Sequence, residues 1–461
     1  MFRVPQLIKR TLAATLLVGL VACTAVPATV DEPEPGPLVA LSSSAVPVAT
    51  PAVLEPTRVP TAAAPAPTLA PTATTAPTNA GPPTTPTPIS ATTRQQIFNE
   101  VWAIVNEHYL YDDFGGVDWA TVRDDFEPRI AVAATDAAFY ELLGFMVGRL
   151  GDDHSRFLPP QAAQREDTLS SGREEQVGIG VIALPMGDGL LIQHVFPDSP
   201  AQRAGLLPRD RIVAIDGVFY TASDIQGPEG TSVRLTVVRP GEGSLDIVLT
   251  RRRVEGRITP LARRLPGEIG YLSVTTLWVS DMDRQVAEAL HELTASGPLR
   301  GMVLDLRSNP GGWRNVLTGI LSHFVRGEVG NFTSRKGDTA LVISAPTSPD
   351  LRGLPLVVLI DSGTASYAEL LAAILQSHAG AVIVGAPSPG NTETIYSYEI
   401  TGGGRLWVAQ EGFSLKNGIE LEGIGVQPDI TVLDDWTRFS ERDDPGLTTA
   451  LRLLAPGAGG K

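Results

Sequence analysis

The residues best suited to chemistry lie in one small-residue turn, Asp-Ser-Gly-Thr-Ala-Ser-Tyr, which contains Ser366. The apolar run 355–360 before it predicts a buried strand, and the apolar spacing over 368–376 after it predicts a helix. Ser366 is therefore expected at a helix N-terminus, where free backbone N–H groups and the helix dipole favour negative charge. Acyl transfer builds an oxyanion beside a nucleophilic serine, so this setting suits Ser366 as a nucleophile. The alternative is a serine that only caps the helix.

A second turn, Leu-Asp-Leu-Arg-Ser-Asn-Pro-Gly-Gly, ends another apolar run. Its glycines, Gly311 and Gly312, allow backbone N–H groups to point into a site without a side chain in the way. They are candidates for one half of an oxyanion hole, and the N–H of Tyr367 is the candidate for the other half. We expect Asp305 and Arg307 to hold this turn by an ion pair. A strand-to-helix turn without chemistry is the alternative.

The periodicity of the chain changes along its length. Apolar residues recur at helical spacing over 94–165, which predicts a helical N-terminal domain with His154 on a loop after a helix end. Over 172–254 the period changes to two, which predicts strands and a closing hairpin. Strands then alternate with helices, which predicts an α/β core over 255–435 with a mostly parallel sheet. The polar, then glycine-rich segment 436–461 is expected to be a C-terminal tail.

The stretch 172–254 resembles a PDZ domain. In that family a glycine-rich loop before a strand gives its backbone N–H groups to a peptide's C-terminal carboxylate, and the peptide adds to the sheet as a strand. The resemblance implies that this loop is formed here by Val177, Gly178, Ile179 and Gly180. The alternative is that the glycines only make a turn.

The N-terminus carries a targeting pattern. A basic start precedes the apolar run 11–21, which is too short for an ordinary membrane-spanning helix and predicts a secretory signal over 1–23. The sequence Leu-Val-Ala-Cys ending at Cys23 resembles a bacterial lipobox, which implies lipidation of Cys23 and attachment to the cell membrane. An ordinary cleaved signal and a retained anchor are the alternatives. All three place the mature chain outside the cytoplasm.

Composition limits the remaining possibilities. A Pro-, Thr- and Ala-rich stretch, 24–93, cannot bury a core and predicts an extended, disordered linker. The net charge of −15 argues against nucleic acid as a partner. A single cysteine excludes a disulfide framework, and no histidine pair has metal-ligand spacing with acids nearby, so we expect no metal and no cofactor. The oligomeric state is not predicted.

Ordered motifs over 94–432 resemble the C-terminal (tail-specific) processing peptidases. These motifs are Asp-x-His-Ser at the end of the helical part, the PDZ-like insert, Asp-Leu-Arg-x-Asn-Pro-Gly-Gly, Thr-Ala-Ser-x-Ala-Glu, and the stretch Glu-Gly-Ile-Gly-Val-Gln-Pro-Asp that begins at Glu422. The resemblance implies a ClpP/crotonase-like α/β core and a serine peptidase that acts on peptides or proteins with free C-termini. It implies Ser366 as the nucleophile, and Gly311 or Gly312 with Tyr367 as the oxyanion hole.

One position departs from the family. Members that use a Ser-Lys dyad carry a lysine where this chain has Asn391. An amide has no useful basicity near neutral pH, so Asn391 cannot take the proton of the serine.

Three hypotheses for the general base remain open. In the tricorn-like branch of the superfamily a histidine and a glutamate complete a triad, and His154 and Glu422 match those positions; imidazole titrates near working pH and a carboxylate stabilises its charged form. Alternatively, Lys416 supplies an amine, although its polar neighbours would leave it exposed. In the third hypothesis the protein is catalytically inactive and binds peptides or acts as a scaffold.

Overall fold

The computed structural model describes residues 88–219, 225–344 and 348–456. The predicted signal 1–23, with Cys23, and most of the predicted linker lie outside the described residues. The predicted linker boundary at 93 is wrong by a few residues, because the first helix begins at Ala91. Ser90 caps that helix by accepting a hydrogen bond from the Thr93 backbone N–H (3.1 Å), which fixes where it starts.

The N-terminal part contains three packed helices, as predicted: α1 (Ala91–His108), α2 (Trp119–Ala131) and α3 (Asp136–Val147). Their apolar faces meet around Ile97, Phe98, Phe139 and Leu143, none of which is exposed. This part is not purely helical, however, because strand β1 (Arg156–Leu158) follows α3. Helix α4 (Pro160–Ser170) also continues past the expected boundary at 165.

The PDZ-like part is an antiparallel sheet with the strand order β3-β4-β5-β7-β8. Its elements are β3 (Val181–Met186), β4 (Gly189–Val195), α5 (Pro200–Arg203), β5 (Arg211–Ile215), β6 (Val218–Phe219), β7 (Ser232–Arg239) and β8 (Gly243–Thr250). The predicted closing hairpin is confirmed as β7–β8. Strands β2 (Arg173–Gly178) and β9 (Arg252–Arg257) form a separate antiparallel ribbon.

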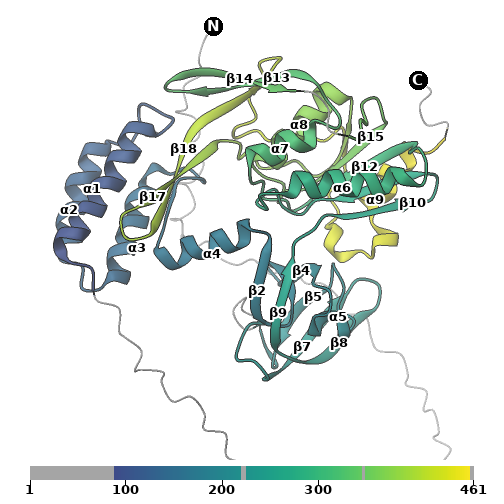
Figure 1. Ribbon diagram of the computed structural model, residues 1–461, viewed down its shortest axis with the longest axis horizontal. Coiled ribbons are helices and arrows are strands. Elements are labelled where there is room, and N and C mark those ends of the chain that lie inside the picture. The colour runs from purple at the N-terminus through teal and green to yellow at the C-terminus, as the bar shows by residue number, and fades with distance from the viewer. Residues whose placement is uncertain (1–87, 220–224, 345–347, 457–461) are drawn as a thin grey trace, which may run out of the picture. The chain divides into compact units, whose positions relative to one another are not determined.

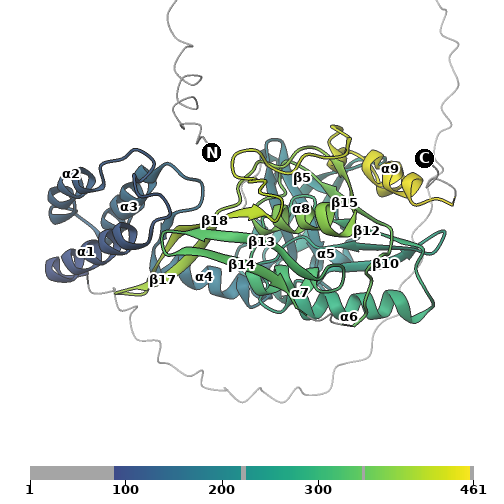
Figure 2. The ribbon, with the colours of Figure 1, turned by 90° about the horizontal axis from the view of Figure 1, so that it is seen from above.

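The predicted α/β core is confirmed. Its sheet has the order β10-β11-β12-β15-β16-β19, in which the β10–β11 pair is antiparallel and the other pairs are parallel. These strands are β10 (Leu261–Leu265), β11 (Ile269–Ser273), β12 (Gly301–Asp305), β15 (Leu356–Ile360), β16 (Val382–Gly385) and β19 (Ile430–Thr431). Helices α6 (Met282–Ala295), α7 (Arg314–Leu321) and α8 (Tyr367–Ala379) pack on one face. Helix α9 (Pro445–Leu453) packs on the other face through Leu447 and Ala450 (Figure 2).

A second sheet, which the sequence analysis did not predict, joins the helical part to the core. It contains β1, β17 (Thr394–Ile400), β18 (Gly404–Leu415), β13 (Gly327–Ser334) and β14 (Gly337–Ile343). The first half of the long strand β18 packs on the α1–α3 helices, and its second half pairs with β13 beside the core (Figure 1). This strand brings the loop that carries His154 toward the α/β core.

The segment after residue 435 is not the tail that the sequence suggested. It contains two short 3-10 helices, Trp436–Arg438 and Glu441–Asp443, and then α9. The N-cap of α9, Asp444, is fully buried and forms an ion pair with Arg307 (2.9 Å). The segment is therefore part of the packed core.

Candidate active site

Ser366 lies in the turn between β15 and α8, with backbone angles φ 56° and ψ −131°. A positive φ in a residue with a Cβ atom costs on the order of 1–3 kcal/mol and persists only where the surroundings impose it. Here the Ser366 N–H donates to the carboxylate of Glu369 (3.0 Å) and to the backbone carbonyl of Asn391 (2.8 Å). The predicted helix-start position is confirmed, and two acceptors hold the turn in its strained geometry.

Glu369 organises the loop that faces Ser366. Its carboxylate is fully buried and accepts from the Asn391 N–H (2.9 Å), the Gly390 N–H (2.7 Å) and the Ser388 hydroxyl (2.6 Å). Burial raises the pKa of Glu369, and these donors partly oppose that rise. Sequence reasoning gave Glu369 no role, although its Ser-x-x-Glu spacing at a helix start is a capping-box signal.

Asn391 therefore lies beside Ser366, where a lysine would be needed for a Ser-Lys dyad. The next residue, Thr392, donates its N–H (2.8 Å) and its hydroxyl (3.1 Å) to the carboxylate of Glu422. Thr392 thus anchors Glu422, and Thr392 is the next residue after Asn391, whose backbone carbonyl binds the Ser366 N–H.

His154 reaches the same region through β1. The backbone N–H of His154 donates to the carboxylate of Asp152 (2.9 Å), and the hydroxyl of Ser155 accepts from the Ala409 backbone N–H on β18 (3.0 Å). His154 is 7% exposed, and its Nε2 atom has no hydrogen-bond partner within the described residues, so Ser366 is not its partner here. A buried, unpaired polar atom is costly in a structural role.

The charge of Glu422 acts on the imidazole of His154. Burial lowers the pKa of His154 below its usual value, while the charge of Glu422, and then that of Asp152, raises it in part. The imidazole is therefore neutral near pH 7, which is the form that can accept a proton.

The glycine turn packs directly against Ser366. A Cβ atom on Gly311 would lie 2.7 Å from the Ser366 Cβ and 2.9 Å from the Tyr367 backbone nitrogen, so only glycine fits there. The Gly311 N–H donates to the side chain of Asn309 (2.9 Å), whereas the N–H groups of Gly312 and Tyr367 have no internal acceptor in the part of the chain that the structure describes. We therefore expect Gly312 and Tyr367 to be the oxyanion donors and Gly311 to permit the close approach.

The ion pair expected to hold this turn is confirmed. The Arg307 guanidinium donates to both carboxylate oxygens of Asp305 (2.9 and 2.6 Å). Asp361 ties the two turns together, because it accepts from the Ser308 N–H (2.7 Å) and from the Gly363 N–H (3.0 Å). Sequence reasoning did not identify Asp361 as this link.

The structure does not favour Lys416 as the general base. Its side chain is exposed, as its polar neighbours predict, and its charge acts on His378 in the last turn of α8. Ser366 precedes the first turn of that helix, about 18 Å away at 1.5 Å per residue.

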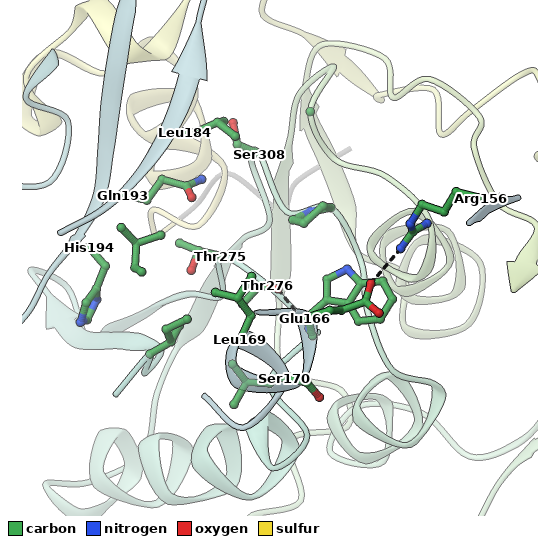
Figure 3. Close-up of a pocket in the computed structure, with 16 residues that line it drawn as sticks. Arg156, Glu166, Leu169, Ser170, Leu184, Gln193, His194, Thr275, Thr276 and Ser308 are labelled. Atoms are coloured by element: carbon green, nitrogen blue, oxygen red, sulfur yellow. Dashed lines mark hydrogen bonds and ion pairs between the residues drawn. The ribbon is translucent and has the colours of Figure 1, made fainter. Parts of the chain in front are cut away.

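A pocket of about 420 Å³ lies beside the two turns (Figure 3). Its walls come from the PDZ strands (Ile182, Leu184, Gln193, His194), from α4 with the preceding strand (Arg156, Glu166, Leu169, Ser170), and from the core (Ile258, Thr275, Thr276, Trp278, Val279, Ser308, Pro310, Gly363). Figure 3 shows the Glu166–Arg156 ion pair on the side of the pocket away from the PDZ residues Leu184 and Gln193. The pocket thus connects the PDZ-like strands to Ser308 and Gly363, which lie in the two turns around Ser366.

The predicted peptide-binding loop lies at the start of β3, an edge strand of the PDZ sheet. Val177 and Gly178 belong to the β2–β9 ribbon, and Ile179 and Gly180 make the turn into β3. Gly180 has φ +83°, and a Cβ atom there would lie 2.3 Å from the Ser199 Cβ, so glycine is required. A peptide strand added beside β3 would begin at this loop, as PDZ recognition requires.

A buried carboxyl beside the site was missed by sequence reasoning. Glu393 is 4% exposed and accepts a hydrogen bond from the hydroxyl of Tyr111. Burial raises its pKa to about 7; the Tyr111 hydrogen bond lowers the pKa, and the nearby charges of Glu422 and Asp152 raise it further. No motif marks Glu393, because its burial depends on the helical domain folding over it.

Glu393→Gln should stabilise the protein at alkaline pH. A carboxyl whose pKa is raised on folding adds no cost below its unfolded pKa, costs progressively more as pH rises to its folded pKa, and costs a constant amount above it. A shift of the Glu393 pKa from 4.5 to about 7 corresponds to roughly 3 kcal/mol, so we expect a gain of about 1–3 kcal/mol in unfolding free energy at pH 8. Urea unfolding at pH 8 and pH 5 measures the unfolding free energy, and the gain of Glu393→Gln over wild type should at least halve at pH 5. Glu328→Gln, on the exposed side of β13, is the matched control; an equal gain at both pH values would contradict the assignment.

The geometry points to a class of protein: a serine hydrolase in which Ser366, at a strand–helix turn of an α/β core, is the predicted nucleophile. The model of peptidase family S41 matches residues 268–432, a PDZ domain model matches 192–239, and the model of the tricorn protease C1 domain matches 90–148. The chain belongs to the C-terminal processing peptidases, which are serine-type peptidases. The predicted family, fold and enzyme class are confirmed.

Individual relatives agree over most of the chain. The carboxyl-terminal-processing protease of Synechocystis sp. is 28% identical over 385 residues, covering 80% of this chain and 88% of that protein. The chloroplastic carboxyl-terminal-processing peptidase 2 of Arabidopsis thaliana is 29% identical over 368 residues, covering 73% and 68%. The solved photosystem II D1 C-terminal processing protease superposes with a TM-score of 0.52 at 25% identity, covering 79% of this chain and 98% of that one. His154 falls between the regions that the family models match.

Proposed function

We propose that this chain is an extracytoplasmic endopeptidase that captures protein C-termini with its PDZ domain and cleaves them through an acyl-enzyme at Ser366. His154 is the general base, and Glu422 orients and stabilises it. One observation carries this assignment: the buried Nε2 of His154 has no hydrogen-bond partner among the described residues, and Glu422, whose charge acts on this imidazole, is anchored beside the loop that holds Ser366.

The reaction follows from these positions. His154 takes the hydroxyl proton as the Ser366 Oγ attacks the scissile carbonyl, and the oxyanion accepts hydrogen bonds from the Gly312 and Tyr367 N–H groups. Protonated His154 then gives its proton to the leaving amine, and water, activated by the same imidazole, hydrolyses the acyl-enzyme. The gap between His154 and Ser366 closes when substrate fills the site, because hydrogen bonds between catalytic groups often tighten only in the complex.

The extracytoplasmic location is supported by the signal pattern over 1–23, and the membrane attachment by the lipobox-like sequence at Cys23. Both stay predictions. Within the described residues, no helix combines the length and the apolar character needed to cross a bilayer.

The proposed function is tested by trapping the acyl-enzyme. Full-length protein is incubated with an unfolded protein substrate and, separately, with a fluorophosphonate that labels activated serines. We expect cleavage, and a covalent adduct that peptide mass spectrometry places on Ser366. A substrate peptide with a free C-terminus should have a KM at least several-fold lower than its amidated form, since the amide lacks the carboxylate that the PDZ loop binds.

The contrary outcomes are distinct. If the protein neither cleaves nor reacts with the probe but still binds peptides with free C-termini, it is the inactive peptide-binding relative that Asn391 suggests. If it cleaves both peptides with equal KM, the peptidase assignment stands and capture of the carboxylate is wrong.

A further inference from the structure

The segment 435–444, which we call the C-terminal clasp, lies beyond the region that matches the peptidase family model. Its side chains contact both the PDZ part and the turns around Ser366. Neither the family comparison nor the catalytic mechanism gives it a role.

On the core side, the clasp ends at the residue that ties the two catalytic turns together. The indole Nε1 of Trp436 donates to the Asp361 carboxylate (2.8 Å). That carboxylate also holds the backbone N–H groups of Ser308 and Gly363, both of which line the pocket. Trp436 is therefore linked by two successive hydrogen bonds, through Asp361, to the backbone of both turns.

On the PDZ side, the same indole meets an arginine from the turn before β5. The Arg209 guanidinium lies 5.1 Å from the Trp436 ring centroid, and the Arg307 guanidinium from the catalytic turn lies 4.4 Å from it. Each distance is within the range of a cation–π contact. Trp436 thus contacts one arginine of the PDZ part and one of the core.

A buried carboxylate repeats this link. Asp444 is fully buried and accepts from Arg209 (2.9 Å) and from Arg307 (3.2 Å). Burial alone would raise its pKa, but the charges of Arg307 and Arg209 outweigh burial and lower it. Arg211 on β5 adds a hydrogen bond to the clasp residue Thr437 and an ion pair with the clasp residue Asp435 (3.8 Å), so the PDZ part is held through several side chains.

We propose that Trp436 is a positioning residue that sets the two catalytic turns through Asp361 and fixes the PDZ domain relative to them. The proposal rests on the function proposed above. Removing the indole N–H should release Asp361 and loosen the turns at Ser308 and Gly363. Substrate binding to the PDZ loop would be affected less, because that loop lies at the start of β3 and the clasp contacts the turn before β5.

The test compares Trp436→Phe with wild type in the full-length protein. Phenylalanine keeps an aromatic ring between the arginines and lacks the N–H donor. A hydrogen bond to a charged group is lost, so we expect kcat to fall about 10-fold to 100-fold while KM for a peptide with a free C-terminus changes less than 3-fold. Hydrogen exchange should become faster in the turns 308–312 and 361–366. Asp434→Asn, an exposed position beside the clasp, is the matched control and should match wild type.

A double-mutant cycle separates this role from general stability. If Trp436 acts through Asp361, then Trp436→Phe should change kcat less than 2-fold in an Asp361→Asn background. Additive losses, or exchange at the turns that stays unchanged in Trp436→Phe, would overturn the proposal. The exchange measurement needs no turnover. If wild type proves inert toward substrate and probe, the proposed function fails, and exchange still decides whether Trp436 holds the turns.

Discussion

His154→Ala should reduce kcat about as far as Ser366→Ala, by a factor of roughly 10³ or more, with both variants folded. Members of a catalytic triad act as a unit, so the loss of the base leaves a hydroxyl that cannot be deprotonated near neutral pH. The structure provides the reason to expect this of His154: within the part of the chain that the structure describes, its buried Nε2 has no hydrogen-bond partner, and the charge of Glu422 acts on the ring. Cleavage of an unfolded protein, followed over at least four decades of rate, measures the loss. His291→Ala, an exposed position on α6, is the control.

A small effect of His154→Ala on kcat would indicate that His154 has a structural role where β1 pairs with β18. The companion variant Asn391→Lys makes the comparison decisive. The backbone carbonyl of Asn391 accepts a hydrogen bond from the Ser366 N–H, so a lysine at position 391 would lie beside Ser366. If wild type is inert and Asn391→Lys cleaves, the chain is a relative that has lost its base. If wild type cleaves and Asn391→Lys restores activity to His154→Ala, both bases serve the same hydroxyl.

The features predictable from sequence are those that depend on neighbouring residues. The periods of apolar residues predicted the α/β core. The small-residue turns predicted the positions of Ser366 and of the Gly311–Gly312 pair, because strand ends and helix starts depend on residues close together in the chain. The spacing of Glu369 from Ser366 is also local, and a closer reading would have found its role. His154 and Glu422 were reached only through resemblance to a family, since no local pattern joins residues so far apart in the chain.

The features that sequence reasoning missed arise from long-range pairing. Strand β1 pairs Arg156 with Trp407, and no alternation in so short a strand identifies that partner. Glu393 is buried beside Tyr111, which lies 282 residues earlier in the chain, and Trp436 lies in a polar segment whose composition suggests a tail. Each of these residues is near the catalytic turns, so the tertiary contacts absent from local sequence patterns are the ones that complete the site.

Glu422→Gln should lower kcat/KM by a factor of roughly 10² to 10⁴ and should also move its pH dependence. The amide keeps the shape of the side chain and can still accept from the Thr392 hydroxyl, so the local fold should persist. It lacks the negative charge that stabilises the imidazolium of His154, which accounts for the loss of rate. That same charge raises the pKa of His154, so its removal lowers the pKa further below the ordinary value.

The sign of the pH shift identifies the mechanism. The neutral imidazole is the active base, so the rate of wild type should rise with pH through the folded pKa of His154, and burial places this acid limb below about 6.5. In Glu422→Gln the limb should move to still lower pH while the plateau falls. Glu420→Gln, an exposed neighbour, should leave both the limb and the plateau unchanged. A limb that stays fixed while the plateau falls would show that Glu422 only anchors Thr392, and that some other group sets the protonation of the base.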